Sequence, residues 1–345
     1  MKRTIEAALL VLGPLAAQAE PLAIRVEATA ETEGTRGDAD DPAIWVDPAD
    51  PANSLILGTD KSAGLYVYGL DGMVRDFLPD GALNNVDLRP FTLGGRAVTL
   101  VGATRRDDDT LVFYVIEDGE VRRATPWRHA AIPADLGEAD DIYGFAMGRD
   151  DGGTYAIANF KSGHVVQWRL VDDGGALRLE PARVLRLATQ PEGMVADDRA
   201  GHLYVGEEDE GIWRYPLSPD GGTQGVQVAA IPSDCLPVDD VEGLAILDGQ
   251  EPGGARYLVA SAQGIHRAAI YRLDGEAMPV CEALVEVAAG AVDGVTETDG
   301  LDVTALPVGP DYPGGLMVMM DDQNAGFTTG FKLIGWDAIA ARLPD

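Results

Sequence analysis

Short runs of alternating apolar and polar residues extend along nearly the whole chain, and they recur as two kinds of block. The first block joins polar or acidic residues to the start of an apolar stretch, as in DDPAIWVD from Asp40. Six copies follow one another at intervals of 44 to 58 residues. The copies are aligned on these positions: Pro42, Val86, Gly144, Gly193, Gly243 and Gly300.

The second block follows each copy of the first, and it consists of two alternating stretches around a polar loop. An example is LYVGEEDEGIWRYP, which begins at Leu203. Alternation with period two, aromatic and β-branched residues, and Asp-Gly turns together predict β-hairpins. Six such units predict an all-β fold, a six-bladed β-propeller. A β-sandwich would also contain many short strands, but two sheets do not explain a sixfold repeat. Helix is expected only as a turn or two in the tail, WDAIAARL.

The first 19 residues have the features of a secretory signal peptide. Lys2 and Arg3 precede an apolar run, and the small residues of AQA at Ala17 to Ala19 suit cleavage. We therefore expect a leader at residues 1–19, a single propeller domain at residues 20–345, and export to the periplasm or the outside. Elsewhere the chain lacks the roughly 18 consecutive apolar residues that a membrane span needs.

The charge balance limits the partners. The chain has 57 acidic and 26 basic residues, for a formal net charge of −31. This charge argues against nucleic acid or a membrane surface as a partner and favours cations, or ligands that cations carry. We expect the protein to be a monomer.

Cys235 and Cys281 are the two cysteines, and an even pair in an exported chain more often forms a disulfide than a catalytic or metal site.

Equivalent loops of a propeller lie at equivalent heights around one axis, so the acidic loop Glu207 to Glu210 should face the loops of the other blades. A solvated turn is the simpler explanation of that run. However, further acids begin the neighbouring repeats, and converging carboxylates repel one another unless a cation lies among them. Oxygen ligands favour Ca²⁺, with Mg²⁺ or Mn²⁺ as alternatives, and the four histidines show no zinc-ligand spacing. The acids of the first block are Glu192, Asp240, Glu242 and Asp299.

Basic residues also occupy equivalent loops. The chain has four lysines, and two of them, Lys61 and Lys161, lie at matching positions. With Arg105 and Arg106 they would form a basic sector beside the acidic one. Such a divided site suits a polyanion that is bound through both bases and calcium, although surface solvation of these bases is the alternative explanation.

Taken together, these motifs resemble those of the β-propeller phytases, calcium-dependent hydrolases of myo-inositol hexakisphosphate (phytate). The resemblance extends from about Asp38 to Arg342, and its specificity lies in the combination of motifs in family order. The motifs are DDPAIW, NNVDLR, DIYGF, EGMVADD, EEDEGIW, DVEGL, SAQG and TDGLDV.

The resemblance implies roles for particular residues of this chain. Several calcium ions would be held at the cleavage site by Glu192, Glu208, Asp240, Glu242 and Asp299, with Glu207 and Asp293 nearby. Structural calcium would be bound by Asp41 and by the backbone carbonyls of Pro42 and Val86. Substrate phosphates would contact Lys61, Arg106, Tyr143 and Lys161, with Gln263 at the same mouth. The residues implied in catalysis are Tyr143, Lys161, Glu192 and Glu208.

Two of these residues also have a structural explanation. Tyr143 lies beside a glycine and could pack in a core, and Gln263 could satisfy backbone groups in a tight loop. The family also often has a second lysine where Ser62 stands in this chain.

The implied activity is release of phosphate from phytate, or calcium-phytate, by water or hydroxide held at the metal, without a covalent intermediate. Other phosphatase motifs are incomplete: WRHAAIP lacks the pattern around a catalytic histidine, and Cys235 precedes no phosphate-binding loop. Two alternatives remain, a calcium-dependent lactonase or esterase propeller and a calcium-binding propeller without catalysis.

Overall fold

The computed structural model describes residues 20–133, 139–249, 254–275, 277–324, 326 and 328–344. The expected leader, residues 1–19, lies outside the described residues. No helix in the described part is long and apolar enough to cross a membrane.

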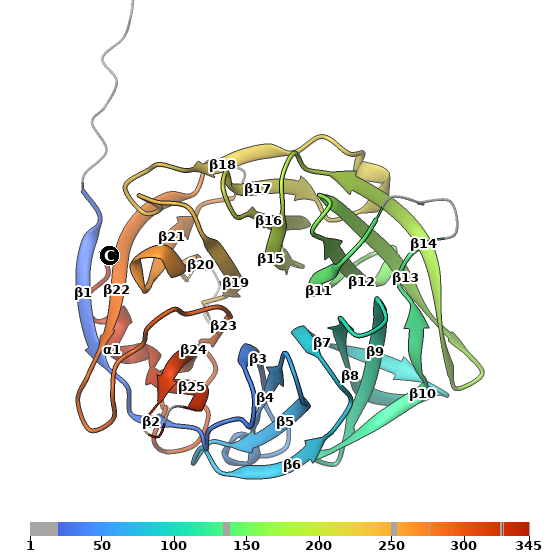
Figure 1. The fold of residues 1–345 in the computed structure, drawn as a ribbon, viewed down its shortest axis with the longest axis horizontal. Helices are drawn as coiled ribbons and strands as arrows, with labels where there is room; N and C mark the ends of the chain where they lie inside the picture. Colours follow the sequence, from blue (N-terminus) through green and yellow to red (C-terminus); the bar gives the residue numbers. More distant parts are fainter. Residues whose placement is uncertain are drawn as a thin grey trace, which may run out of the picture.

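Six sheets stand around a central axis, with the first full strand of each repeat innermost (Figure 1). Blade 1 contains β3 (Ala39–Trp45), β4 (Leu55–Asp60), β5 (Gly64–Gly69) and β6 (Val74–Leu78). Blade 2 contains β7 (Leu83–Leu93), β8 (Arg96–Arg105), β9 (Thr110–Glu117) and β10 (Glu120–Ala130). Blade 3 contains β11 (Ile142–Asp150), β12 (Gly153–Phe160), β13 (His164–Asp173) and β14 (Ala176–Arg186).

The other three blades follow in sequence order. Blade 4 contains β15 (Pro191–Asp197), β16 (His202–Glu207), β17 (Gly211–Pro216) and β18 (Val226–Ala230). Blade 5 contains β19 (Val241–Leu247), β20 (Arg256–Ala262), β21 (Arg267–Leu273) and β22 (Val280–Ala288). Blade 6 contains β23 (Leu301–Thr304), β24 (Leu316–Asn324) and β25 (Thr328–Gly335). The predicted six-bladed β-propeller is confirmed.

The N-terminal segment closes the ring. Strand β1 (Leu22–Glu27) runs parallel to β22 at the outer edge of blade 5. Strand β2 (Ala30–Glu31) then pairs with β25 and completes blade 6. In Figure 1 the blue N-terminal strand accordingly lies beside the orange strand β22. The repeats in the sequence did not predict that N-terminal strands would pair with blades 5 and 6, because each repeat was expected to form its own blade.

Hydrophobic side chains fill the spaces between adjacent blades. In the described part of the chain, each of six buried clusters includes residues of two neighbouring blades. Between blades 2 and 3, for instance, the buried rings of Phe113 and Phe145 meet edge to face, with centroids 6.5 Å apart. Because each blade buries its faces against both neighbours, no blade forms a separate domain.

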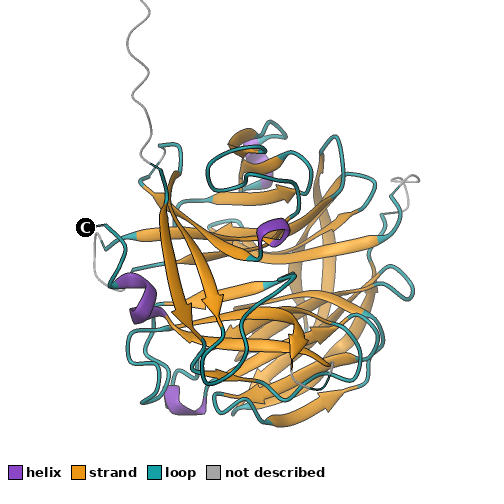
Figure 2. Cartoon of the chain, turned by 60° about the vertical axis from the view of Figure 1, so that its left-hand side comes forward, coloured by secondary structure: helices purple, strands orange, loops and turns teal. Residues whose placement is uncertain are grey.

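Helix is confined to short segments, as Figure 2 shows. The helix α1 (Trp336–Ala340) follows β25 directly, and its Trp336 and Ile339 are buried. This agrees with the one or two turns expected for the tail. Single 3₁₀ turns are formed by Pro51–Asn53, Pro219–Gly221 and Gln263–Ile265.

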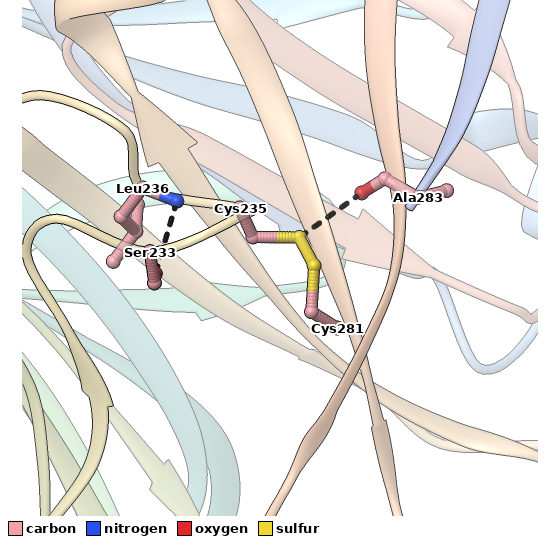
Figure 3. Close-up of a disulfide and its surroundings, with 5 residues drawn as sticks. All are labelled: Ser233, Cys235, Leu236, Cys281 and Ala283. Carbon is pink, nitrogen blue, oxygen red and sulfur yellow. Dashed lines mark hydrogen bonds between the residues drawn. A yellow bond between two sulfur atoms is a disulfide. The ribbon is translucent and has the colours of Figure 1, made fainter. Parts of the chain in front are cut away.

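A disulfide joins Cys235 to Cys281 with their Cα atoms 6.0 Å apart (Figure 3), as expected from the sequence. Cys281 lies on β22, whereas Cys235 lies in the segment that connects β18 to β19. In the same segment the Leu236 amide donates to Ser233 Oγ at 3.3 Å. The bridge therefore fixes the connection that leads into the innermost strand of blade 5.

The ammonium of Lys332 stabilises the closed ring from inside. Its side chain is fully buried on β25, and Nζ donates to Glu31 Oε2 at 2.5 Å, to Asn324 Oδ1 at 2.6 Å and to Asp293 Oδ1. Burial alone would lower the pKa of Lys332, but the hydrogen bonds to Asp293 and Glu31 raise it above its ordinary value. Since Glu31 belongs to β2, one buried cation ties the closing strand to blade 6.

Replacing Lys332 tests this account of closure. Lys332→Met keeps the length of the side chain but leaves the surrounding carboxylates without their cation, which should cost about 3 to 5 kcal/mol of unfolding free energy. Arg25→Met is the matched control, because Arg25 is exposed and its pair with Glu286 spans 3.7 Å; it should change stability by less than about 1 kcal/mol. Denaturant unfolding measures both, and equal effects would contradict the role given to Lys332.

Candidate active site

The innermost strands share an irregularity that builds the mouth of the propeller. Pairing of β3 with β4 is interrupted between Ala39 and Pro42, and pairing of β15 with β16 between Pro191 and Met194. Strands β7, β11 and β19 are interrupted at the equivalent place. Each interruption leaves two residues outside the ladder, as a β-bulge does.

These five bulges, together with the segment before β23 in blade 6, define a ring of six residues, one from each blade, which we call the inner ring. The register aligns Asp40 with Glu192, and Asp41 with Gly193. The sequence alignment on Pro42 and Val86 is therefore one residue out in blades 1 and 2. In blade 6 the equivalent residue lies two positions before β23, separated from it by Gly300. The inner ring consists of Asp40, Asn84, Tyr143, Glu192, Glu242 and Asp299.

Glycine follows the inner-ring residue wherever the next blade comes too close for a side chain. A Cβ on Gly144 would lie 1.9 Å from the Glu192 carbonyl oxygen, and one on Gly193 would lie 2.0 Å from the Glu242 carbonyl oxygen. Both distances are far inside van der Waals contact. Backbone packing around the axis therefore requires glycine at these two positions of the repeat.

Polar side chains from the second strands hold the bulged peptides in place. Asn159 accepts a hydrogen bond from the Gly144 amide at 2.7 Å and donates to the Glu192 carbonyl at 2.6 Å. Thr104 Oγ1 donates to the Tyr143 carbonyl at 2.5 Å in the same way. Blades 2 and 3 are thus each bonded to the inner-ring backbone of the following blade.

A second ring, the hairpin ring, comes from the loops between the second and third strands. The Lys61 amide donates to the Asp38 carbonyl at 2.8 Å, and the Glu208 amide donates to the Gln190 carbonyl at 3.0 Å. The same bond recurs in blades 2, 3 and 5, whereas in blade 6 the acceptor lies one residue earlier. The hairpin ring consists of Lys61, Arg106, Lys161, Glu208, Gln263 and Asp322.

Three predicted metal ligands come together where the rings meet. Glu192, Glu208 and Glu242 each place a carboxylate oxygen within 4.8 Å of the others. Glu192 and Glu242 are buried, and within the described part of the chain Oε2 of each has no hydrogen-bond partner. Gln190 donates to Glu208 Oε1 at 2.5 Å.

Burial and mutual repulsion favour protons or a cation at this cluster. Burial, opposed by the Gln190 amide and supported by the charges of Glu192 and Asp240, raises the pKa of Glu208 to about 7. Burial also raises the pKa of Glu242 well above its usual range, and the neighbouring Glu192 adds to the effect. A compensating cation is therefore needed to keep the Glu208 and Glu242 carboxylates both charged at neutral pH.

Asp240 precedes the cluster on a constrained backbone. Its φ is +86°, in the left-handed region, and its amide donates to the Glu208 carbonyl at 2.9 Å. A non-glycine residue in this region carries backbone strain that the surrounding structure must maintain. The bond to the Glu208 carbonyl supplies part of that restraint.

The bases stand next to the carboxylates. Lys61 Nζ lies 2.6 Å from Asp299 Oδ2, 3.6 Å from Asp38 Oδ2 and 3.9 Å from Asp40 Oδ1. Gln263 donates to the other oxygen of Asp299. Asp299 is therefore bound between an ammonium and an amide from different blades.

The other two bases, Lys161 and Arg106, both lie close to the ring of Tyr143. Lys161 Nζ is 4.3 Å from the centre of that ring, and the Arg106 guanidinium carbon is 5.4 Å from it, both within cation–π range. Burial and the carboxylates of Glu192 and Glu242 raise the pKa of Tyr143 well above its ordinary value. The hydroxyl therefore remains protonated beside the acidic cluster.

Three other residues singled out in the sequence point away from the mouth. Both oxygens of Glu207 are engaged behind it, by Thr189 at 2.6 Å and by Trp213 Nε1 at 2.7 Å. Asp293 binds Lys332. Arg105 donates to the Asp80 carbonyl at 2.7 Å, so it does not join Arg106.

Asp41, Pro42 and Val86 lie along the axis rather than at the mouth. They line a cavity of about 990 Å³ between the innermost strands. Asp41 Oδ2 accepts a hydrogen bond from the Val86 amide at 3.0 Å, which links blades 1 and 2. Burial raises the pKa of Asp41 well above its usual range, so the charged carboxylate would be stabilised by a bound cation.

The residues present fit a hard metal ion. The donors at the mouth are carboxylate oxygens, and two of them are buried without a hydrogen-bond partner in the described structure. Such donors suit calcium or magnesium rather than zinc.

Fold and site together define a class of protein: a six-bladed propeller whose mouth combines a carboxylate cluster with lysine and arginine. The model of the family described as Phytase matches residues 4–345. A 3-phytase of Bacillus subtilis (strain 168) is 37% identical over 318 residues, which covers 88% of this chain and 81% of that protein. The chain belongs to the phytase family, and it is an enzyme of the phytase class.

Among solved structures, the chain is similar to one titled "Crystal structure of BBS1N in complex with ARL6DN, soaked with lead". The TM-score is 0.45 and the identity is 13%, over 81% of this chain and 74% of that one.

Three ring residues were not identified as candidates from the sequence: Asp40, Asn84 and Asp322. Asp40 is buried, and its oxygens have no hydrogen-bond partner in the described structure, although Lys61 lies nearby. The sequence shows an acidic pair before Pro42 and an amide pair before Val86. Only the bulge register shows that the first residue of each pair, Asp40 or Asn84, matches Glu192.

The raised pKa of Glu208 predicts how stability depends on pH without metal. As pH rises from about 4.5, the unfolded chain loses this proton first, and the folded protein keeps it until about 7. The folded state therefore loses stability across that window. With a chelator present, the melting temperature should be lower at pH 8 than at pH 5.

Two controls make this measurement specific to Glu208. Glu208→Gln should show a smaller decrease between the two pH values, and saturating calcium should reduce the decrease in the parent. A metal-free melting temperature that is constant or rises across the window would contradict the environment described for Glu208.

Proposed function

We propose that the protein is a calcium-dependent phosphomonoester hydrolase that releases phosphate stepwise from phytate. One observation carries the proposal: Arg106 and Lys161 both lie within cation–π range of the Tyr143 ring, and Tyr143 borders the Glu192 and Glu242 carboxylates. A phosphate bound by these bases would lie against the metal ligands. Membership of the phytase family and the relative named 3-phytase support this substrate.

Calcium would be held at the mouth by Glu192, Glu208 and Glu242, together with Asp240 and Asp299. When bound, calcium would neutralise substrate charge and make water a better nucleophile. Asp41 and the carbonyls of Pro42 and Val86 would hold a further, structural ion. This second site would connect blades 1 and 2, where Asp41 already bonds to the Val86 amide.

The basic residues would bind and orient phosphate oxygens. The Arg106 guanidinium can donate two parallel hydrogen bonds, while Lys161 supplies a point charge. Contact with the Tyr143 ring restricts both side chains before substrate arrives. Because its hydroxyl stays protonated, Tyr143 would donate a hydrogen bond from Oη to a phosphate or leaving-group oxygen.

Lys61 and Gln263 would bind the adjacent part of the substrate. Both contact Asp299, so they are held at the mouth from blades 1 and 5, the two neighbours of blade 6. Phytate carries several phosphates, and a second group of donors would orient the ring while Arg106 and Lys161 hold the reacting phosphate.

The proposal requires no covalent nucleophile from the protein. Cys235 is bound in the disulfide, so its sulfur is not a thiolate. His129 packs edge to face on Phe113 at the outer strand of blade 2, and burial lowers its pKa. Neither residue is among the members of the two rings.

We also infer export of residues 20–345 as one domain after removal of the leader, to the periplasm or the outside, where a disulfide persists. A monomer would suffice, because all the proposed site residues come from one chain.

Phosphate release decides the function. Phytate should release phosphate when calcium is present, and chelation should abolish the release. Turnover of esters or lactones without phosphate release would favour a lactonase or esterase, and calcium-dependent binding without turnover would favour a non-catalytic module. Either result would contradict the proposal.

Two variants should fail in different ways. Glu208→Gln removes a ligand charge and should lower kcat at least about 10-fold. Lys161→Ala removes a phosphate contact and should mainly raise KM, by about 10-fold. Steady-state kinetics with phytate distinguishes the two effects.

The matched controls lie on the outer edge of blade 3. Glu180→Gln and Arg178→Ala alter an exposed ion pair of 2.5 Å, and they should leave both constants within about twofold of the parent. Equal behaviour of site and control variants would show that the acidic loop is only a solvated turn.

A further inference from the structure

Asn84 differs in chemistry from the rest of the inner ring. Four members of that ring are carboxylates and one is a tyrosine, whereas the blade 2 position is a neutral amide. The side chain is completely buried. A buried amide beside several carboxylates is costly unless its donors and acceptors are used.

The hydrogen bonds of Asn84 account for its amide group. Nδ2 donates to Glu192 Oε1 at 2.9 Å and to Asn85 Oδ1 at 2.9 Å. Oδ1 is 3.4 Å from the Arg106 guanidinium, which donates to it. Asn84 therefore contacts a proposed metal ligand with one end and a proposed phosphate-binding base with the other.

These contacts connect blades that are not neighbours. Asn84 and Arg106 belong to blade 2, and Glu192 belongs to blade 4, with Tyr143 of blade 3 between them. The bond to Oε1 fixes the rotation of the Glu192 carboxylate. Oε2 is left buried and without a hydrogen-bond partner in the described structure, beside Glu208 and Glu242.

Other residues of similar size would not provide these contacts. Aspartate has no donor for Glu192 and would add a negative charge against it. Leucine would leave both Glu192 Oε1 and the Arg106 guanidinium without this partner. The position requires a neutral group that donates on one side and accepts on the other.

We propose that Asn84 is a positioning residue that holds the Glu192 carboxylate in its metal-binding orientation and couples it to Arg106. The inference rests on the function proposed above, because it gives Glu192 the role of a calcium ligand. Groups that orient a metal ligand from behind typically affect metal affinity or activity by about 10- to 100-fold.

The test measures calcium binding separately from catalysis. Asn84→Ala and Asn84→Leu are titrated with calcium by calorimetry without phytate, and kcat and KM are then measured with phytate. Both variants should bind the mouth calcium about 10- to 100-fold more weakly. They should also lower kcat more than they raise KM.

Gln167→Ala is the matched control for a merely structural amide. Gln167 is equally buried, donates to the Leu217 carbonyl at 2.9 Å and accepts from Arg183 at 3.0 Å, away from the two rings. Its loss should lower the melting temperature while calcium affinity and kcat stay within about twofold of the parent. If the Asn84 variants behave like Gln167→Ala, the inference is wrong.

The outcomes separate this inference from the proposed function. A parent that binds calcium without hydrolysing phytate would contradict the function, and the calorimetry alone would then decide the role of Asn84. A parent that binds no calcium would overturn both. If neither Asn84 variant folds, a crystal structure of the parent decides: an Asn84 amide nitrogen bonded to Glu192 supports the inference, and a separation beyond about 3.5 Å overturns it.

Discussion

The close approach of six backbone segments at the propeller axis is the constraint on which the rest of the structure depends. At Gly144 and Gly193 the next blade leaves no room for a Cβ atom. The bulges let the strands come this close while each still pairs with its own second strand. In five of the six blades the same bulges turn one side chain toward the mouth. The same backbone feature therefore allows close packing at the axis and positions the side chains of the site.

That geometry concentrates negative charge. Four of the six inner-ring positions are carboxylates, and burial raises the pKa of each one for which a shift is resolved: Asp40, Glu242 and Asp299. The hairpin ring compensates part of this charge on one side, where Lys61 binds Asp299. On the Glu192 side the compensation is smaller, and a bound cation would supply it. The division into a basic and an acidic sector follows from which blades contribute which residues.

Much of this arrangement was predictable because it depends on local sequence. Alternation of apolar residues, Asp-Gly turns and the repeat length predicted the blades, and equivalent loop positions brought Lys61, Lys161 and Glu208 to one face. The remainder depends on register and distant contacts. Asp40 and Asn84 were missed because a bulge shifts their alignment by one residue.

Two acidic residues show a further limit of sequence patterns. Glu207 and Glu208 are adjacent, yet Glu207 is the last residue of β16 and Glu208 is the first residue of the following turn. Glu207 is bonded to Thr189 and Trp213, whereas Glu208 lies with the carboxylates at the mouth. Asp293 accepts a hydrogen bond from Lys332. Lys332 is completely buried, and no local sequence pattern indicated that burial. The pairing of β1 with β22 and of β2 with β25 likewise joins segments that are far apart in the sequence.

The central claim is that the bulged backbone gathers carboxylates of blades 4 and 5 into a calcium site next to the bases of blades 1 to 3. Anomalous diffraction from crystals grown with calcium tests it most directly. The account predicts anomalous density bounded by the carboxylates of Glu192, Glu208 and Glu242. Crystals with calcium bound elsewhere on the protein but none at this cluster would contradict it.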